Sequence, residues 1–289
     1  MLTERVRRWR AAGALEGIMG RRLYVQRRAG HGPLLVFLHG FPSSSYDWRG
    51  VIELLGGRQV LLLDFLGFGL SEKPRDHVYS LRWQADAVEE LVRRAGSPPV
   101  VLVAHDVGTS VATELLARAL ERKLTIDVQR ALLFNGSILL DLARPTISQK
   151  LLRSPAGPLV ARLSNERSFR MQFAHLFSPE RPLTAEEAAD QWALVSHGDG
   201  HRLLHRTIHY MSERERLAER WHGAFRDWPG RLSLAWGLQD PVATPAVLGA
   251  LRELRPGIPV RELAQAGHYP QIEDPTAMGE LIAGDLDAR

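Results

Sequence analysis

Asp106 is the side chain in this sequence whose surroundings best suit nucleophilic chemistry. It stands at the centre of the segment 104–108, Ala-His-Asp-Val-Gly, directly after an apolar run and directly before a helical pattern. Small residues on either side, Ala104 and Gly108, let the backbone take the strained strand-to-helix bend of a nucleophile elbow. The amides and dipole of the following helix favour a carboxylate there. We predict that Asp106 forms a covalent ester with a substrate; the competing interpretation is a plain helix N-cap.

Three further segments supply chemical partners for this carboxylate. Phe41 follows a His-Gly pair after the first apolar run, and its backbone N–H together with that of Val107 can form an oxyanion hole. Asp240 follows a late strand pattern, and His268 lies on the loop after the last one. Nucleophile, acid and histidine then stand in the chain order of one known hydrolase architecture. Each segment alone is a common turn or surface loop, but their order and placement point to a catalytic triad.

Six short apolar runs predict the strands that position these groups. They span residues 33–38, 59–64, 99–104, 128–134, 231–236 and 259–263. Helical spacing between them predicts helices over 80–94, with Ser80 as the cap, and over 107–121. Continuous apolar strands alternating with helices indicate an α/β fold, with a mostly parallel central sheet and helices on both faces.

Residues 138–224 break this alternation, because they contain no strand pattern and their helical stretches are separated by prolines. We predict a helical cap inserted into one α/β core, which comprises residues 1–137 and 225–289. Ligands of open parallel sheets bind at the carboxyl ends of the strands. The cap is therefore expected to cover the substrate site.

The chain resembles the α/β-hydrolase fold superfamily, and within it the epoxide hydrolase and haloalkane dehalogenase group. The group's pattern His-Asp-x-Gly occurs here at 105–108, and similarity runs over residues 33–275 except for the helical insertion. The stretches 39–48 (HGFPSSSYDW), 63–74 (LDFLGFGLSEKP) and 267–275 (GHYPQIEDP) resemble the mesoderm-specific transcript branch of this superfamily.

This resemblance implies a reaction in two halves. The Asp106 carboxylate attacks an electrophilic carbon and displaces a leaving group, which gives an alkyl-enzyme ester. His268 then takes a proton from water, which attacks the carbonyl carbon of the ester. Asp240 would hold the imidazole in the right tautomer, and the amides of Phe41 and Val107 would stabilise the oxyanion.

The leaving group is predicted from side chains around the elbow. Dehalogenases of the group hold a halide with side-chain N–H donors at the positions of Phe41 and Val107, neither of which has one. Epoxide hydrolases use cap tyrosines, and Tyr210 alone is available in the insertion. The second tyrosine donor is missing, and His175 or His209 could substitute for it. Tyr210 itself could be a half-buried structural tyrosine rather than a donor to the substrate.

Hydrolysis of an epoxide to a diol is accordingly the leading hypothesis for function. The alternatives are a haloalkane dehalogenase or an ester hydrolase with an atypical pocket, and a non-catalytic binding protein on the same fold. The substrate is expected to be a small apolar electrophile. No cofactor is expected.

Composition excludes several other classes. The formal net charge is +4 over 289 residues, and the arginines are scattered among acidic residues, so we expect no nucleic-acid binding. There is no cysteine, and no apolar run reaches the ~18 residues of a membrane span. We expect a cytoplasmic protein without stable membrane insertion; a homodimer is one arrangement left open. His201, His205 and His209 form a helical stripe that lacks carboxylates, so no metal site is expected.

Overall fold

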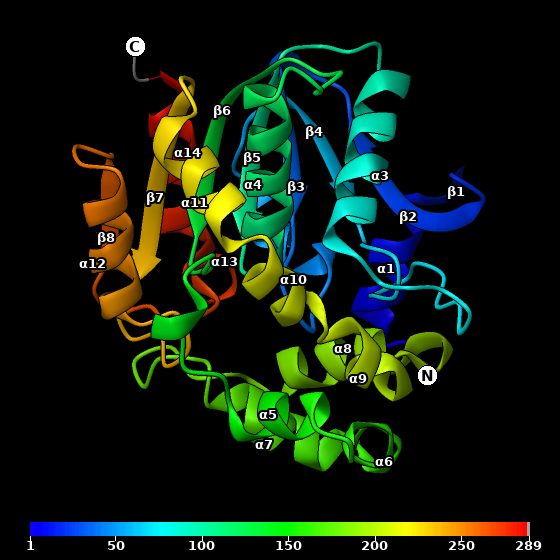
Figure 1. The fold of residues 1–289 in the computed structure, drawn as a ribbon. Coiled ribbons are helices and arrows are strands. Elements are labelled where there is room, and N and C mark those ends of the chain that lie inside the picture. Colours follow the sequence, from blue (N-terminus) through cyan, green and yellow to red (C-terminus); the bar gives the residue numbers. More distant parts are fainter. Residues whose placement is uncertain (288–289) are drawn as a thin grey trace.

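The computed structural model describes residues 1–287, and within them an eight-stranded sheet forms the centre of the molecule (Figure 1). Its strands are β1 (Ala14–Ile18), β2 (Arg21–Arg28), β3 (His31–Leu38), β4 (Arg58–Leu63), β5 (Val100–His105), β6 (Val128–Phe134), β7 (Arg231–Gly237) and β8 (Val260–Leu263). Their order across the sheet is β1-β2-β4-β3-β5-β6-β7-β8. The pairings β1–β2 and β2–β4 are antiparallel, and all others are parallel. The predicted mostly parallel sheet is confirmed.

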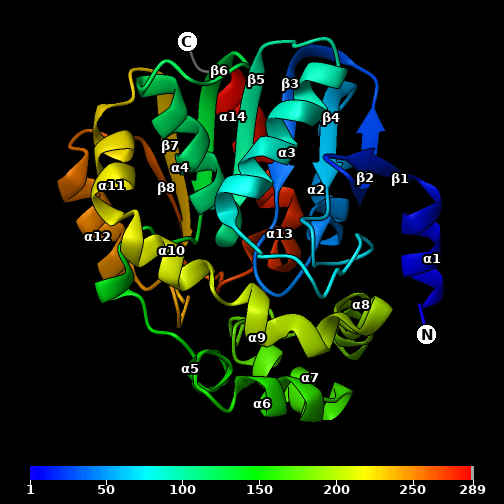
Figure 2. The ribbon, with the colours of Figure 1, turned by 45° about the vertical axis from the view of Figure 1, so that its right-hand side comes forward.

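Helices cover both faces of this sheet (Figures 1 and 2). They are α1 (Glu4–Ala11), α2 (Arg49–Ile52), α3 (Leu81–Arg94), α4 (Val107–Leu120), α5 (Ile147–Arg153), α6 (Gly157–Leu163), α7 (Glu166–Ala174), α8 (Ala185–Ser196), α9 (Leu204–Thr207), α10 (Tyr210–Arg216), α11 (Ala218–Asp227), α12 (Pro245–Leu254), α13 (Pro270–Glu273) and α14 (Pro275–Asp287). α3, α4 and α11 lie on one face, and α2 and α14 lie on the other. The α/β class with helices on both faces is therefore confirmed.

The apolar strands divide their side chains between two hydrophobic clusters. In β3, Val36 and Leu38 join the cluster under α3 and α4, whereas Leu35 and Phe37 join the cluster under α14. All four side chains are fully buried. Successive residues of a strand point to opposite faces, so a strand covered on both sides must be apolar throughout. This requirement explains why the parallel strands could be predicted from continuous apolar runs.

The helices α5 to α10, here called the β6–β7 helices, lie beyond the edge of the sheet where the parallel strands end (Figure 1). Between Phe134 and Arg231 the structure contains no strand. The predicted cap boundary at 138 falls between β6 and α5. The boundary at 224 falls inside α11, which packs against α4 on the face of the sheet. Residues 218–224 of the predicted cap therefore pack with the sheet layers, so on structural grounds we place the second boundary before α11.

The amino-terminal region contains the elements that the sequence did not predict. β1 and β2 form an antiparallel hairpin at the edge of the sheet. β2 reads RRLYVQRR, and only its four central residues are buried, so it offers too short an apolar run to stand out. The helix α1 lies before it in the chain, with Val6 and Trp9 buried. No helix within residues 1–287 has both the length and the apolar character needed to cross a membrane.

Candidate active site

Asp106 occupies a strained turn between β5 and α4. Its backbone angles are φ 44° and ψ −107°, a region that side-chain-bearing residues rarely adopt. Gly108 is required beside it, because a Cβ at this position would lie 2.4 Å from the Leu38 carbonyl oxygen. Gly40 is required opposite it, since a Cβ there would lie 2.9 Å from the Asp106 Cβ. The backbone thus has the form of a nucleophile elbow.

The Asp106 carboxylate is buried and accepts a backbone hydrogen bond. Its Oδ2 lies 2.9 Å from the Phe41 nitrogen, so this amide is aimed at the carboxylate as the sequence predicted. No hydrogen bond in the described structure joins the Val107 amide to the same carboxylate. Of the two expected oxyanion-hole donors, the Phe41 amide therefore contacts the Asp106 carboxylate. The Val107 amide is next to Asp106 in the sequence but makes no hydrogen bond to its carboxylate.

His268 and Asp240 form a close pair beside the elbow. His268 Nδ1 lies 2.7 Å from Asp240 Oδ2, and both side chains are almost completely buried. Asp240 is fixed in turn, because its Oδ1 accepts the amides of Val242 and Ala243 at 2.7 and 3.0 Å. Its Oδ2 also accepts a hydrogen bond from Asn135 Nδ2 at 2.8 Å. With so many donors to Asp240, His268 has a defined ring orientation and donates from Nδ1.

The second ring nitrogen of His268 faces the elbow, with Nε2 4.0 Å from Asp106 Oδ2. Burial alone would lower the pKa of His268, but the carboxylates of Asp240 and Asp106 raise it to about 8. Burial would raise the pKa of Asp106, yet the Arg214 guanidinium and His268 hold it below its usual value. At neutral pH the site therefore contains a carboxylate and an imidazolium.

His105, directly before Asp106, ties the histidine loop to the elbow. Its Nε2 lies 2.7 Å from the His268 carbonyl oxygen. Burial, reinforced by the neighbouring charge of His268, lowers the pKa of His105 to about 3, so its ring is neutral and donates to that carbonyl. The histidine of the His-Asp pattern thus positions the loop that carries His268.

Arg214 is a site residue that the sequence analysis missed. This α10 side chain is only 3% exposed, and its Nη2 lies 3.0 Å from the Asp106 carbonyl oxygen and 3.4 Å from Asp106 Oδ1. Its Nε donates to Ser110 Oγ at 2.7 Å. The available signal was its position four residues after Tyr210, which places both on one helix face.

Tyr210 is buried between Phe41 and Arg214. Its ring centroid lies 5.7 Å from that of Phe41 and 4.6 Å from Arg214 Cζ. Burial raises the pKa of its hydroxyl well above the usual value, so it stays a neutral donor. His175 and His209, considered as substitutes for a second donor, are both exposed, and like Tyr210 they are not among the residues that line the pocket described below.

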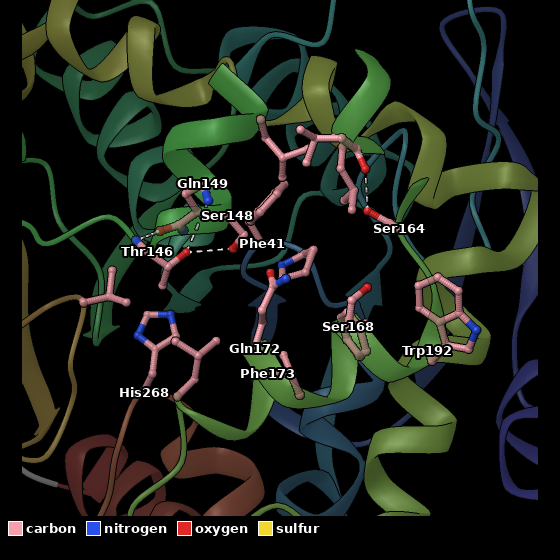
Figure 3. Close-up of a pocket in the computed structure, with 17 residues that line it drawn as sticks. Phe41, Thr146, Ser148, Gln149, Ser164, Ser168, Gln172, Phe173, Trp192 and His268 are labelled. Atoms are coloured by element: carbon pink, nitrogen blue, oxygen red, sulfur yellow. Dashed lines mark hydrogen bonds between the residues drawn. The ribbon is translucent and has the colours of Figure 1, made fainter. Parts of the chain in front are cut away.

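A pocket of about 90 Å³ is lined mainly by the β6–β7 helices, with a few residues from loops of the core (Figure 3). His268 and Phe41 line one side of it, with Phe173 and Trp192 among the apolar walls (Figure 3). The polar side chains of the lining are uncharged: Thr146, Ser148, Gln149, Ser164, Ser168 and Gln172. Apart from His268, the lining contains no ionisable acid or base. Such a pocket suits a neutral, largely apolar small molecule.

Comparison with known families agrees with this geometry. The family described as alpha/beta hydrolase fold matches residues 33–275. The chain belongs to the alpha/beta hydrolase fold family. The central sheet with its covering helices is thus that of a hydrolase fold, as the resemblance implied.

Relatives of this alpha/beta hydrolase include full-length matches. The Mycobacterium tuberculosis protein named "Putative hydrolase LipZ" is 50% identical over 280 residues, covering 97% of each chain. The mesoderm-specific transcript protein of Mus musculus is 36% identical over 287 residues, covering 95% of this chain and 85% of that protein. The predicted similarity to the mesoderm-specific transcript branch is confirmed.

Solved structures with the same fold include both enzyme classes considered above. An epoxide hydrolase, CorEH, superposes with a TM-score of 0.78 at 22% identity, covering 94% of this chain and 97% of that one. A haloalkane dehalogenase variant from Bradyrhizobium elkanii superposes with a TM-score of 0.79 at 23% identity, covering 95% of each chain. At these identities the likeness establishes the fold alone.

Proposed function

We propose that this hydrolase opens epoxides to diols through a covalent ester on Asp106, with His268 and Asp240 as the other members of a catalytic triad. The observation that carries the proposal is the Asp106 carboxylate at the elbow, with the Phe41 N–H on Oδ2 and His268 Nε2 4.0 Å away. The adjoining pocket is uncharged apart from His268. This arrangement suits attack on a neutral carbon electrophile.

In the first half-reaction, an Asp106 oxygen forms a bond to an epoxide carbon while the ring C–O bond breaks. The ring oxygen leaves as an alkoxide that stays attached to the substrate and needs a proton. The His268 imidazolium is suited to supply it, because its pKa is raised to about 8 by Asp240 and Asp106 against the effect of burial. Tyr210 is proposed to donate a hydrogen bond to the same oxygen.

In the second half-reaction, the neutral His268 takes a proton from water and the hydroxide adds to the ester carbonyl carbon. The negative charge that develops on the carbonyl oxygen is stabilised by the Phe41 amide, joined by that of Val107 once the ester has formed. Asp240 stabilises the imidazolium that reappears. Collapse of the tetrahedral intermediate releases the diol as the departing oxygen takes the proton from His268, and the new Asp106 carboxyl group then passes its own proton to His268, which restores the starting state.

The raised pKa of His268 is compatible with an epoxide substrate. An alkoxide leaving group accepts the proton of the imidazolium and so generates the base for the second half-reaction. A halide does not accept this proton. Phe41 and Val107 also lack the side-chain N–H donors that would hold a halide at these positions.

A paired product assay tests the proposal. The protein is incubated with apolar epoxides and with haloalkanes of matched size, and diol and halide are measured. We expect diol formation that is abolished in Asp106→Ala, and little halide release. Halide release exceeding diol formation would favour the dehalogenase alternative. Diol formation that persists in Asp106→Ala would rule out Asp106 as the nucleophile.

A further inference from the structure

Arg214 has no part in the two half-reactions described above, yet it is the buried cation nearest to the proposed nucleophile. It comes from α10, whereas Asp106 and Ser110 belong to the elbow and to α4. Two hydrogen bonds fix its guanidinium, to Ser110 Oγ and to the Asp106 carbonyl oxygen, and a longer contact of 3.4 Å reaches Asp106 Oδ1. The Tyr210 ring packs against its other side. The cation is therefore held in one place beside Asp106.

The two oxygens of the Asp106 carboxylate are held differently. Oδ2 accepts the Phe41 amide at 2.9 Å, which marks it as the carbonyl oxygen of the ester. Oδ1 has no backbone donor and faces Arg214 Nη2 at 3.4 Å, a long and weak contact. Because the Arg214 contact is longer than the hydrogen bond from Phe41, we assign Oδ1 as the ester oxygen bonded to the substrate carbon.

This assignment determines which bond breaks next to Arg214. In ester hydrolysis, hydroxide adds to the Asp106 carboxyl carbon, and the bond from that carbon to Oδ1 then breaks. Oδ1 departs with the substrate as an alkoxide, takes a proton from the His268 imidazolium and becomes a hydroxyl of the diol. The oxygen from water replaces it in the regenerated carboxylate. Negative charge therefore develops on the atom that faces Arg214.

We propose that Arg214 is a catalytic residue of ester hydrolysis, which stabilises the departing Oδ1. This inference rests on the proposed function of Asp106. A guanidinium is permanently charged and strongly attracts a developing alkoxide at a buried position such as this. The new carboxyl group then passes the remaining proton of the water to the neutral His268, so Asp106 regains its charge and Arg214 also stabilises the product state of the protein.

The same contact has the opposite effect on the first half-reaction. Ester formation removes the carboxylate charge that Arg214 stabilises, so the guanidinium lowers the reactivity of the nucleophile. A purely structural ion pair would affect both half-reactions through loss of the folded site. Opposite effects on ester formation and ester hydrolysis therefore distinguish a catalytic Arg214 from a structural one.

Rapid-quench mass spectrometry of Arg214→Met with an epoxide measures both rates through the adduct on the peptide that contains Asp106. We expect ester formation at the native rate or faster, and ester hydrolysis slowed by about 10²–10³-fold, so the adduct accumulates. Arg214→Lys keeps a charge and is expected to retain part of the hydrolysis rate. The matched control is Arg216→Met, an exposed position of the same helix, which should leave both rates unchanged.

The outcomes separate the inference from the proposed function. Suppose that His268→Gln forms the adduct and that Arg214→Met hydrolyses the ester at the native rate. The covalent mechanism would then stand, and only the role of Arg214 would be overturned. Slower ester formation without adduct accumulation in Arg214→Met would also overturn the role of Arg214. Absence of any adduct in His268→Gln would instead overturn the covalent mechanism. If Arg214→Met does not fold, as judged by circular dichroism, Arg214→Gln provides the test, because it removes the charge but keeps an N–H donor; native ester hydrolysis in that variant would contradict the proposal.

Discussion

His268 stands between two carboxylates, with Nδ1 2.7 Å from Asp240 Oδ2 and Nε2 4.0 Å from Asp106 Oδ2. The contact with Asp240 is a hydrogen bond that fixes the ring, whereas the contact with Asp106 is long enough to be replaced by water or by a substrate group. One imidazole can therefore exchange protons on the Asp106 side while remaining anchored on the other. The first two predictions follow from this asymmetry.

The pH dependence of ester hydrolysis is the first prediction. The pKa of His268 is raised to about 8 while Asp106 is charged, in spite of burial. Esterification removes the Asp106 charge, so the pKa of His268 in the ester falls below that value. Hydrolysis needs the neutral ring, and its rate should fall about tenfold for each pH unit below the lowered pKa. Rapid-quench measurements from acidic to alkaline pH check this, and a rate constant independent of pH would contradict it.

Asp240→Asn is expected to impair turnover severely without unfolding the protein. The amide keeps the size of the side chain but removes the charge that raises the pKa of His268. The amide also favours the wrong tautomer of the imidazole ring. We expect kcat to fall by about 10³–10⁴-fold, as in related triads. The pKa of His268, measured by NMR, should also fall below about 8. A variant with native kcat would show that Asp240 does not serve the imidazole.

Tyr210→Phe separates the proposed hydrogen-bond donor from the aromatic ring. Loss of the hydroxyl should slow ester formation by about 10–10²-fold, because ring opening loses a donor. Ester hydrolysis should stay near its native rate, since the ring still packs against Arg214. Rapid-quench kinetics with an epoxide give both values. Native ester formation in this variant would identify Tyr210 as a packing residue.

Gly108→Ala tests the backbone of the elbow. The added Cβ would lie 2.4 Å from the Leu38 carbonyl oxygen. This oxygen belongs to the backbone at the end of β3, so it cannot move aside as a flexible side chain could. Overpacking of this kind destabilises a protein by about 1–3 kcal/mol, which chemical denaturation would measure. The control is Gly249→Ala in α12, where nothing lies within 4 Å of the new Cβ. That change should stabilise the fold by up to about 1 kcal/mol, because alanine favours a helix interior. Equal effects at the two positions would contradict the account of the elbow.

The parallel strands and the polar groups at their ends could be predicted because they depend on local patterns. β3, β5 and β7 are continuous apolar runs, and Phe41, Asp106 and Asp240 follow them within a few residues. The helix cap at Ser80 was equally local, and its side chain accepts the Trp83 amide at 3.3 Å. Local signals of this kind survive folding because tertiary packing reinforces them.

Arg214 could not be predicted because its function depends on a contact across the fold. Its partner Asp106 lies 108 positions away in the sequence, and only the course of the β6–β7 helices brings them together. The sequence also could not show which amides contact the carboxylate. The Asp106 carboxylate interacts with Phe41 and Arg214 instead of with the Val107 amide. A sequence motif can place a nucleophile, but not a cation supplied by a distant helix.

Mass spectrometry of His268→Gln after incubation with an epoxide tests the central claim most directly. This substitution removes the base of the second half-reaction and leaves Asp106 and Phe41 in place, so the ester should persist. We expect an increase equal to the mass of the epoxide on the peptide that contains Asp106, and no increase in Asp106→Ala. An unmodified peptide after incubation with epoxides that the native protein hydrolyses would contradict it.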